Sequence, residues 1–189
     1  DWQFPVIIDN MMNLEMLFWT SEVTGDPKYS DAAISHADVT IENHFRDDWS
    51  SYHVVDYDTI TGQPTEKVTH QGLSDESAWG RGQAWGLYGF TMTYRETVDE
   101  KYLNVAENIA GFIMENLPED GVSYWDYNDP DIPETNRDAS AAAITASALF
   151  ELSLLAEDGQ KYLDTANKIV ESLTSEKYRA TGGTNGGFI

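Results

Sequence analysis

Cysteine is absent from the 189-residue sequence, and basic residues are scarce. Without cysteine the chain can form neither a disulfide framework nor a thiolate metal site. Eleven lysines and arginines stand against 33 aspartates and glutamates, which gives a formal net charge of −22 at pH 7. This charge argues against nucleic acid and anionic membranes as partners, because both would repel the chain. No apolar run is long enough to span a membrane. A phosphate loop, a dinucleotide fingerprint and a G-x-S-x-G elbow are also missing.

What is present is typical of a folded domain. The sequence is 41% hydrophobic and 12% aromatic, which excludes a disordered or low-complexity protein. It begins at Asp1 without an initiator methionine or a basic leader, and an apolar segment starts at 186–189. We therefore expect both ends to be cut and residues 1–189 to be part of one larger domain.

Six helices are predicted, in three pairs that share a start. The second helix of each pair opens with the pattern K-Y-x-x-x-A, at Lys28, Lys101 and Lys161, directly after a short turn. One such start would be unremarkable, but three in the same place indicate a repeated helical hairpin. The predicted pairs are 7–24 with 28–45, 78–97 with 100–116, and 139–157 with 160–174.

The two helices of a pair differ in character. Stretch 7–24 is apolar nearly all round, which is typical of a helix buried on several sides, whereas 28–45 is amphipathic like a surface helix. An inner ring of buried helices backed by an outer ring describes an all-α toroid. The long connections 46–77 and 117–137 would gather with the inner-helix N-termini at one mouth, where loops of this length are usually functional. Three hairpins make about half of such a ring.

Asp9 is the first candidate for chemistry. It stands early in an otherwise apolar helix, with Asn13 one turn later, so the two form a polar strip on a buried element. A buried carboxyl has a raised pKa, as a general acid working near neutrality requires. The alternative is an aspartate that only stabilises the helix dipole.

The run 74–86 is rich in residues that suit a carboxylated sugar. With Ser77 as N-cap, Trp79 and Arg81 fall in the first helical turn, and Arg81, Trp85 and Tyr88 share one helix face. A guanidinium beside an aromatic ring can hold a sugar carboxylate while the sugar stacks on the ring. The alternative for Arg81 is an ion pair with one of the many acids. The glycines of this helix, Gly82, Gly86 and Gly89, form a stripe that favours close helix packing.

Loop residues offer weaker signals. His53, His70 and Gln71 lie in the 46–77 connection, but no histidine pair has metal-ligand spacing. The acidic run 126–131 fails the EF-hand pattern, so a solvated loop is the default. Asp138 is most simply the N-cap of the third inner helix. We expect no metal and no cofactor.

These motifs resemble the unsaturated glucuronyl hydrolases of glycoside hydrolase family 88. The resemblance covers essentially the whole chain in order and is most specific in R-G-Q-A-W; the matching runs are 7–14, 69–72, 77–86 and 137–143. The neighbouring unsaturated rhamnogalacturonyl hydrolases more often carry R-G-N-G-W there. The resemblance implies helical hairpins of an (α/α)₆ barrel, with the N-terminal portion and the C-terminal end of that single catalytic domain missing from this chain.

The resemblance also implies an unusual reaction. The substrate is an oligosaccharide whose terminal uronate carries a C4=C5 double bond left by a polysaccharide lyase, and the enzyme hydrates this vinyl ether. Matched to this sequence, Asp9 is the general acid and then the base for water. The uronate contacts would be His53, Gln71 and Arg81, and the pocket would be lined by Trp79 and Trp85.

One departure and several alternatives remain. The family has a second essential aspartate for which this chain has no matching position, so the fragment alone should be inactive. The alternatives are an unsaturated rhamnogalacturonyl hydrolase and a non-catalytic α/α scaffold that binds acidic sugars or a protein. Parent polysaccharide, sulfate tolerance, oligomeric state and location in the bacterial cytoplasm or periplasm are left open by the sequence.

Overall fold

Helical hairpins make up most of the chain, as the repeated K-Y starts predict. The structure is a computed structural model and describes residues 2–180, so residues 186–189 of the expected cut end lie outside the described part. Helix bounds match the predicted ranges to within two residues: α1 is Leu14–Thr24, α2 Lys28–His44, α3 Gly80–Thr97, α4 Glu100–Asn116, α5 Ala139–Leu155 and α6 Gln160–Leu173. The exception is α1, which begins seven residues later than the predicted helix 7–24.

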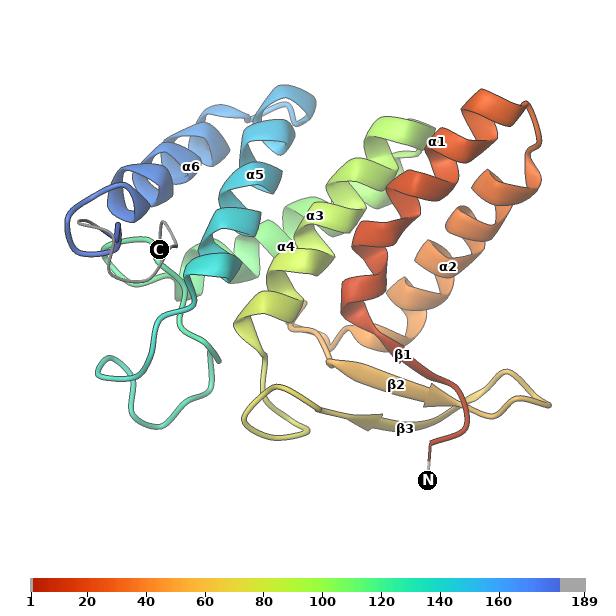
Figure 1. The fold of residues 1–189 in the computed structure, drawn as a ribbon, viewed down its shortest axis with the longest axis horizontal. Helices are drawn as coiled ribbons and strands as arrows, with labels where there is room; N and C mark the ends of the chain where they lie inside the picture. The colour runs from red at the N-terminus through yellow and green to blue at the C-terminus, as the bar shows by residue number, and fades with distance from the viewer. Residues whose placement is uncertain (1, 181–189) are drawn as a thin grey trace.

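The three hairpins stand side by side (Figure 1), with α3 in the middle of the row. Helices α1, α3 and α5 all start at the same end of the molecule, where the β-strands and the connection 117–138 also lie. We call this end the mouth. The prediction that long connections and inner-helix N-termini gather at one place is confirmed for these residues.

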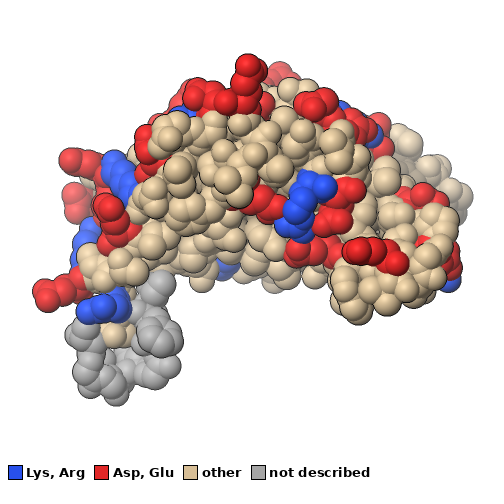
Figure 2. Space-filling view, turned by 90° about the horizontal axis from the view of Figure 1, so that it is seen from above, with Lys and Arg blue, Asp and Glu red and all other residues tan. Residues whose placement is uncertain are grey.

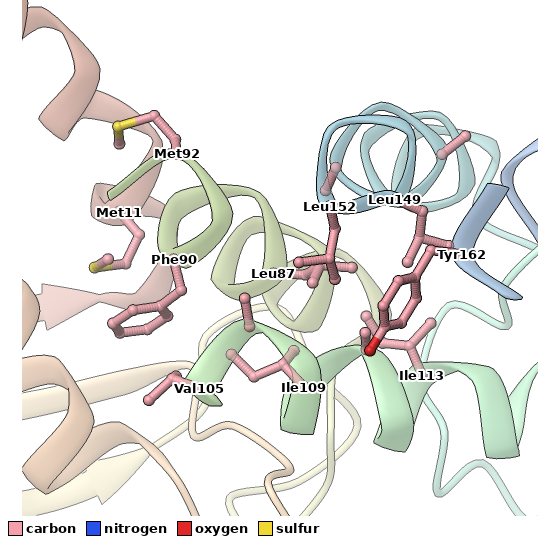
Figure 3. Packing of buried hydrophobic residues seen from close by; sticks show 14 of the residues in the cluster. Met11, Leu87, Phe90, Met92, Val105, Ile109, Ile113, Leu149, Leu152 and Tyr162 are labelled. Carbon is pink, nitrogen blue, oxygen red and sulfur yellow. The ribbon is translucent and has the colours of Figure 1, made fainter. Parts of the chain in front are cut away.

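The hydrophobic core runs along the row of hairpins. Figure 3 shows side chains of α3, α4 and α5 meeting there, with Leu87, Ile109 and Leu149 all fully buried. Tyr162 of α6 and Met11 from before α1 extend the same cluster at its two sides. One continuous cluster therefore joins all three hairpins.

The K-Y-x-x-x-A pattern has a physical basis in the outer helices. In each case the lysine ammonium lies over the ring of the following tyrosine, at 4.7 Å for Lys28, 4.7 Å for Lys101 and 4.8 Å for Lys161. The alanine four residues after each tyrosine is completely buried; these are Ala33, Ala106 and Ala166. The pattern therefore combines a cation–π contact at the surface with a small residue at a helix crossing.

A small antiparallel sheet joins residues 5–7 to part of the connection 46–77, where no strand was predicted. Its strands β1 (Pro5–Ile7), β2 (Val54–Tyr57) and β3 (Pro64–Val68) pair in that order. The buried carboxylate of Asp56 anchors β1 by accepting hydrogen bonds from the backbone N–H groups of Gln3 and Phe4. The strands are three to five residues long, too short for a period-two pattern to be recognised.

The predicted helix 7–24 is wrong in its first half. After β1 the chain forms a 3₁₀ helix, η1 (Ile8–Asn13), before α1 begins. Only one side of this stretch is buried. Met16, Trp19 and Val23 are each more than half exposed, and within residues 2–180 nothing covers them. Asn13 is also exposed, so the expected polar strip with Asp9 does not form.

The acidic composition is visible on the surface. Figure 2 shows aspartates and glutamates spread over the face seen from above, with few lysines and arginines between them. None of the helices in residues 2–180 is both long and apolar enough to cross a membrane.

Candidate active site

Strand pairing brings Asp9 next to His53. In the β1–β2 ladder Ile7 lies opposite Val54, and the N–H of Ile8 donates to the carbonyl of His53 at 3.0 Å. Asp9, two residues after the end of β1, and His53, the residue before β2, are therefore brought together at the mouth. Asp9 Oδ2 and His53 Nε2 lie 3.7 Å apart there, and the two side chains are 15% and 2% exposed.

The hydrogen bonds of His53 determine its tautomer. Its Nδ1 accepts from the backbone N–H groups of His70 at 3.0 Å and Gln71 at 3.1 Å. A ring nitrogen that accepts has no proton, so the proton of the neutral ring is on Nε2, which faces Asp9. Burial, with smaller electrostatic contributions from His70 and Arg81, lowers the pKa of His53 to about 4. The ring is thus neutral near pH 7, and its Nε2–H faces Asp9 at 3.7 Å, a distance beyond that of a hydrogen bond.

Burial raises the pKa of Asp9, and the nearby charge of Arg81 opposes the rise. A carboxyl in this position keeps its proton to higher pH than an exposed aspartate, and can still exist as a carboxylate once the proton is given away. These are the properties of a group that acts first as an acid and then as a base.

Trp79 joins His53 to Arg81. Its ring centroid lies 4.6 Å from that of His53, and the Arg81 guanidinium carbon lies 4.6 Å from the indole. Trp79 is buried at the N-terminus of α3, which leaves Arg81 in the first turn at the mouth. Asp9, His53, Trp79 and Arg81 therefore form one contiguous group, which we call the mouth cluster.

Arg81 also makes an ion pair with Asp138. Nη1 of Arg81 donates to Oδ2 of Asp138, while Oδ1 of Asp138 accepts from the N–H of Ala141 at 2.8 Å. The prediction that Asp138 caps the third inner helix is confirmed, and its link to Arg81 was missed. An N-cap carboxylate has a second oxygen free, which is the signal that could have suggested it. One of five guanidinium N–H groups is used here, so Arg81 keeps donors for a second carboxylate.

The glycine stripe of α3 holds η1 against this helix. A Cβ on Gly82 would lie 3.0 Å from Ile8, and a Cβ on Gly89 would overlap Met11 and lie 3.0 Å from its carbonyl carbon. The predicted close packing is confirmed, with η1 as the partner. Since η1 carries Asp9 and α3 carries Arg81, the stripe sets the spacing of the two groups.

The remaining predicted site residues, Gln71 and Trp85, make no side-chain contact with this group that the structure records. Gln71 is exposed and reaches His53 through its backbone N–H. Trp85 follows Arg81 by one turn and packs edge-on against Tyr88, with centroids 5.8 Å apart. The aromatic ring that Arg81 covers is that of Trp79, so the expected pairing of Arg81 with Trp85 is wrong in its partner.

Two further expectations at the mouth are wrong. Ser77 does not cap α3, because the helix begins at Gly80 and its N-cap is Trp79, which makes no side-chain cap bond. The Ser77 hydroxyl instead donates to Asp126 at 2.7 Å. Asp126 is fully buried, although the run 126–131 was interpreted as a solvated loop. Nothing in the local sequence distinguishes Asp126 from the exposed Asp131. Over residues 2–180, no three histidine, aspartate or glutamate side chains are grouped as metal ligands.

The chain as a whole is similar to known proteins. Residues 2–186 match the family model described as Glycosyl Hydrolase Family 88. The chain is 52% identical over its whole length to an unsaturated glucuronyl hydrolase of Formosa agariphila, and 39% identical over 97% of its length to one of Bacillus sp. strain GL1. Over 79% of its length it is 42% identical to an unsaturated chondroitin disaccharide hydrolase of Streptococcus pneumoniae.

Solved structures agree with this relationship. One, described as an unsaturated glucuronyl hydrolase specific for heparin, superposes with a TM-score of 0.95 at 52% identity over 97% of this chain. Another, of the Bacillus sp. GL1 enzyme, gives a TM-score of 0.86 at 40% identity over 90%. The chain covers 47% and 50% of the Formosa and Bacillus relatives, so it spans about half their length. Its hairpins are part of an α/α barrel, and the chain belongs to glycosyl hydrolase family 88.

Proposed function

We propose that the protein containing this chain removes 4,5-unsaturated glucuronyl residues from the non-reducing ends of oligosaccharides. The observation that carries the proposal is the carboxyl of Asp9, half-buried at the mouth with a raised pKa, between a neutral histidine and an arginine. The names of the relatives support the substrate class, since they act on unsaturated glucuronyl and unsaturated chondroitin units.

The reaction begins with proton transfer. Asp9 in its acid form gives its proton to C4 of the C4=C5 double bond, and positive charge develops at C5 and the ring oxygen. The Asp9 carboxylate then takes a proton from water as the water oxygen bonds to C5. The product is a hemiketal, which opens and releases the next sugar. Asp9 thus ends the cycle protonated, as it began.

The other residues of the mouth cluster bind and orient the substrate. Arg81 uses its free N–H groups to hold the uronate carboxylate, which fixes C4 relative to Asp9. The Nε2–H of His53 and the side chain of Gln71 donate to the sugar, and Trp79 and Trp85 line the pocket. His53 supplies an N–H and no charge, because its pKa is about 4.

The sequence also allows two other functions. An unsaturated rhamnogalacturonyl hydrolase would act on the same unsaturated uronate linked to rhamnose, and a non-catalytic scaffold would have no use for a proton donor at Asp9. The relatives named above are glucuronyl and chondroitin hydrolases, which favours the glucuronyl substrate.

The test uses the complete protein and two disaccharides that carry the same unsaturated uronate, linked in one to the amino sugar of chondroitin and in the other to rhamnose. The uronate itself cannot distinguish the two functions, because the C4=C5 double bond removes the C4 stereocentre at which glucuronate and galacturonate differ. We expect turnover of the chondroitin disaccharide, measured as loss of the absorbance of the double bond, with at least tenfold lower kcat/KM for the rhamnose-linked one. The isolated chain should be inactive on both, because it has no position for the family's second aspartate. Preference for the rhamnose-linked substrate, or no turnover of either, would contradict the proposal.

A further inference from the structure

Asp126 is a buried carboxylate on the connection 117–138, and it is satisfied by neutral groups. Its Oδ2 accepts from the N–H of Leu73 at 2.8 Å and from the Ser77 hydroxyl at 2.7 Å. Its Oδ1 accepts from the N–H of Asn128 at 3.0 Å. Burying a charge without a cation is costly, so these three bonds must compensate for lost water.

Two of the three donors belong to one tight segment, 69–77. Within it Thr69 caps Gly72, whose N–H donates to the threonine hydroxyl at 2.8 Å. A Cβ on Gly72 would lie 2.7 Å from that hydroxyl and 3.2 Å from Asp126, so the segment is folded closely around the carboxylate. Asp126 therefore fixes segment 69–77 from another part of the chain.

The same segment determines the state of His53. Its N–H groups at His70 and Gln71 both donate to Nδ1 of His53, which leaves the ring proton on Nε2 facing Asp9. A displacement of segment 69–77 would release Nδ1 and allow the other tautomer. Nε2 would then have no proton and could only accept from Asp9.

We propose that Asp126 is a positioning residue for the reaction: it anchors segment 69–77 so that His53 keeps the tautomer whose N–H faces Asp9. The inference rests on the proposed function for its effect on turnover, although its effect on His53 does not. Asp126 touches no substrate in this scheme. It acts through Leu73 and the two N–H groups on His53.

An aspartate is required because both carboxylate oxygens accept. In Asp126→Asn one oxygen becomes an amide that can only donate, so either Leu73 and Ser77 or Asn128 would face a donor. The matched control is Asp131→Asn, an exposed aspartate on the same connection. Both variants change the net charge by the same amount.

The first experiment is the pH profile of kcat/KM for the complete protein on the unsaturated glucuronyl disaccharide. In Asp126→Asn we expect kcat/KM to fall at least tenfold and the limb due to Asp9 to move to higher pH, because its carboxylate loses a facing N–H. Asp131→Asn should stay within twofold of wild type with an unmoved limb. Equal effects of the two variants, or an unmoved limb in Asp126→Asn, would overturn the proposal.

The second experiment does not need activity. Nitrogen NMR of the histidine rings, with His53 assigned from a His53→Gln variant, should show a single Nε2–H tautomer in wild type and a mixture in Asp126→Asn. An unchanged tautomer overturns the proposal. A changed tautomer in a protein that does not turn over the disaccharide would reject the proposed function and retain the positioning role.

If Asp126→Asn does not fold, Ser77→Ala provides the test, because it removes one donor and leaves the carboxylate in place. It should move the pH limb and the tautomer ratio in the same direction by a smaller amount. No movement of either in a folded Ser77→Ala protein would overturn the proposal.

Discussion

The carboxyl of Asp9 is held between influences that oppose each other. Burial favours its protonated form, while Arg81 favours the carboxylate. The neutral ring of His53 turns its Nε2–H toward the carboxyl, at 3.7 Å, and adds no charge beside it. A group so balanced can lose and regain a proton within one catalytic cycle.

Replacing Asp9 with asparagine should test this role directly. Asp9→Asn keeps the size and polarity of the side chain but cannot give up a proton. We expect kcat to fall by roughly 10²–10⁴-fold or more, with the melting temperature and substrate affinity nearly unchanged. Steady-state kinetics and a binding titration on the complete protein would measure both. Retention of a tenth of wild-type activity would rule out the assignment.

Replacing Arg81 would remove two interactions, the proposed one with the substrate carboxylate and the ion pair with Asp138. In Arg81→Ala we expect KM to rise more than kcat falls, by about 10- to 100-fold, because hydrogen bonds to charged groups contribute about 1.5–3 kcal/mol. Asp138→Asn, which keeps the cap on Ala141 and removes the ion pair, should have a smaller effect. Kinetics on the free acid and on its methyl ester would check the role: wild type should prefer the acid, and Arg81→Ala should not. A wild-type enzyme indifferent to esterification contradicts it.

His44 and His53 should make stability depend on pH. Burial lowers the pKa of each to about 4, from an ordinary value near 6.5 in the unfolded chain. Between these values the unfolded state binds more protons, so stability is fully present above pH 6.5 and is lost as pH falls toward 4, by on the order of 3 kcal/mol for each histidine.

Urea unfolding of the complete protein at several pH values between 7.5 and 4.5 would measure this loss. The variant His44→Gln should show a shallower pH dependence, because glutamine does not titrate. Its amide can still donate to the carbonyl of Val6, which His44 Nε2 contacts at 3.2 Å, so the hydrogen bond is kept. An identical pH dependence in the variant would show that His44 makes no contribution.

At the scale of elements, sequence patterns predicted the regions whose structure is set by near neighbours. The K-Y starts and the hairpin turns act within one or two helical turns. The glycine stripe can be recognised within one helix, although its partner η1 is distant in the sequence. Asp126 could not be predicted, because its donors Leu73 and Ser77 lie 53 and 49 residues away in the sequence. The 3₁₀ turn at η1 was missed for a similar reason: the pairing of β1 with β2 overrides its helical pattern.

The glycine stripe supports a prediction with an internal control. In Gly89→Ala the new Cβ would overlap Met11, so we expect a loss of about 1–3 kcal/mol from overpacking, or more if η1 is displaced. Gly111 lies in α4 with open space around its Cβ position, and Gly111→Ala should instead stabilise by about 0.5–1 kcal/mol. Urea unfolding of the complete protein would separate the two. Equal effects would mean that the stripe does not set the packing of η1.

For the molecule as a whole, apolar residues are left uncovered at both ends of the row of hairpins. Met16, Trp19 and Val23 are exposed on α1 at one end. At the other, Phe150 and Val170 help line an apolar groove of about 480 Å³ between α5 and α6. Since the chain spans about half of its relatives, we propose that the rest of the barrel covers both ends.

The isolated chain should therefore associate or fold loosely. Contiguous apolar surface beyond a few hundred Å² drives aggregation or dimerisation. Size-exclusion chromatography and near-UV circular dichroism of residues 1–189 should show oligomers or a weak tertiary signal, and adding the missing half should restore a defined species. A monodisperse monomer that melts cooperatively would show that the chain is a complete domain.

The pairing of β1 with β2 also limits where residues can be inserted into the chain during evolution. An extra residue between Ile7 and Asp9, or between His53 and Val54, would move one of the two side chains by one place relative to the paired strands and away from the other. The turn at 58–63 carries no such constraint, because it is exposed and lies beyond the paired residues of β1. Among relatives, insertions should therefore collect at 58–63 and be absent from 7–9 and from the junction of 53 with 54.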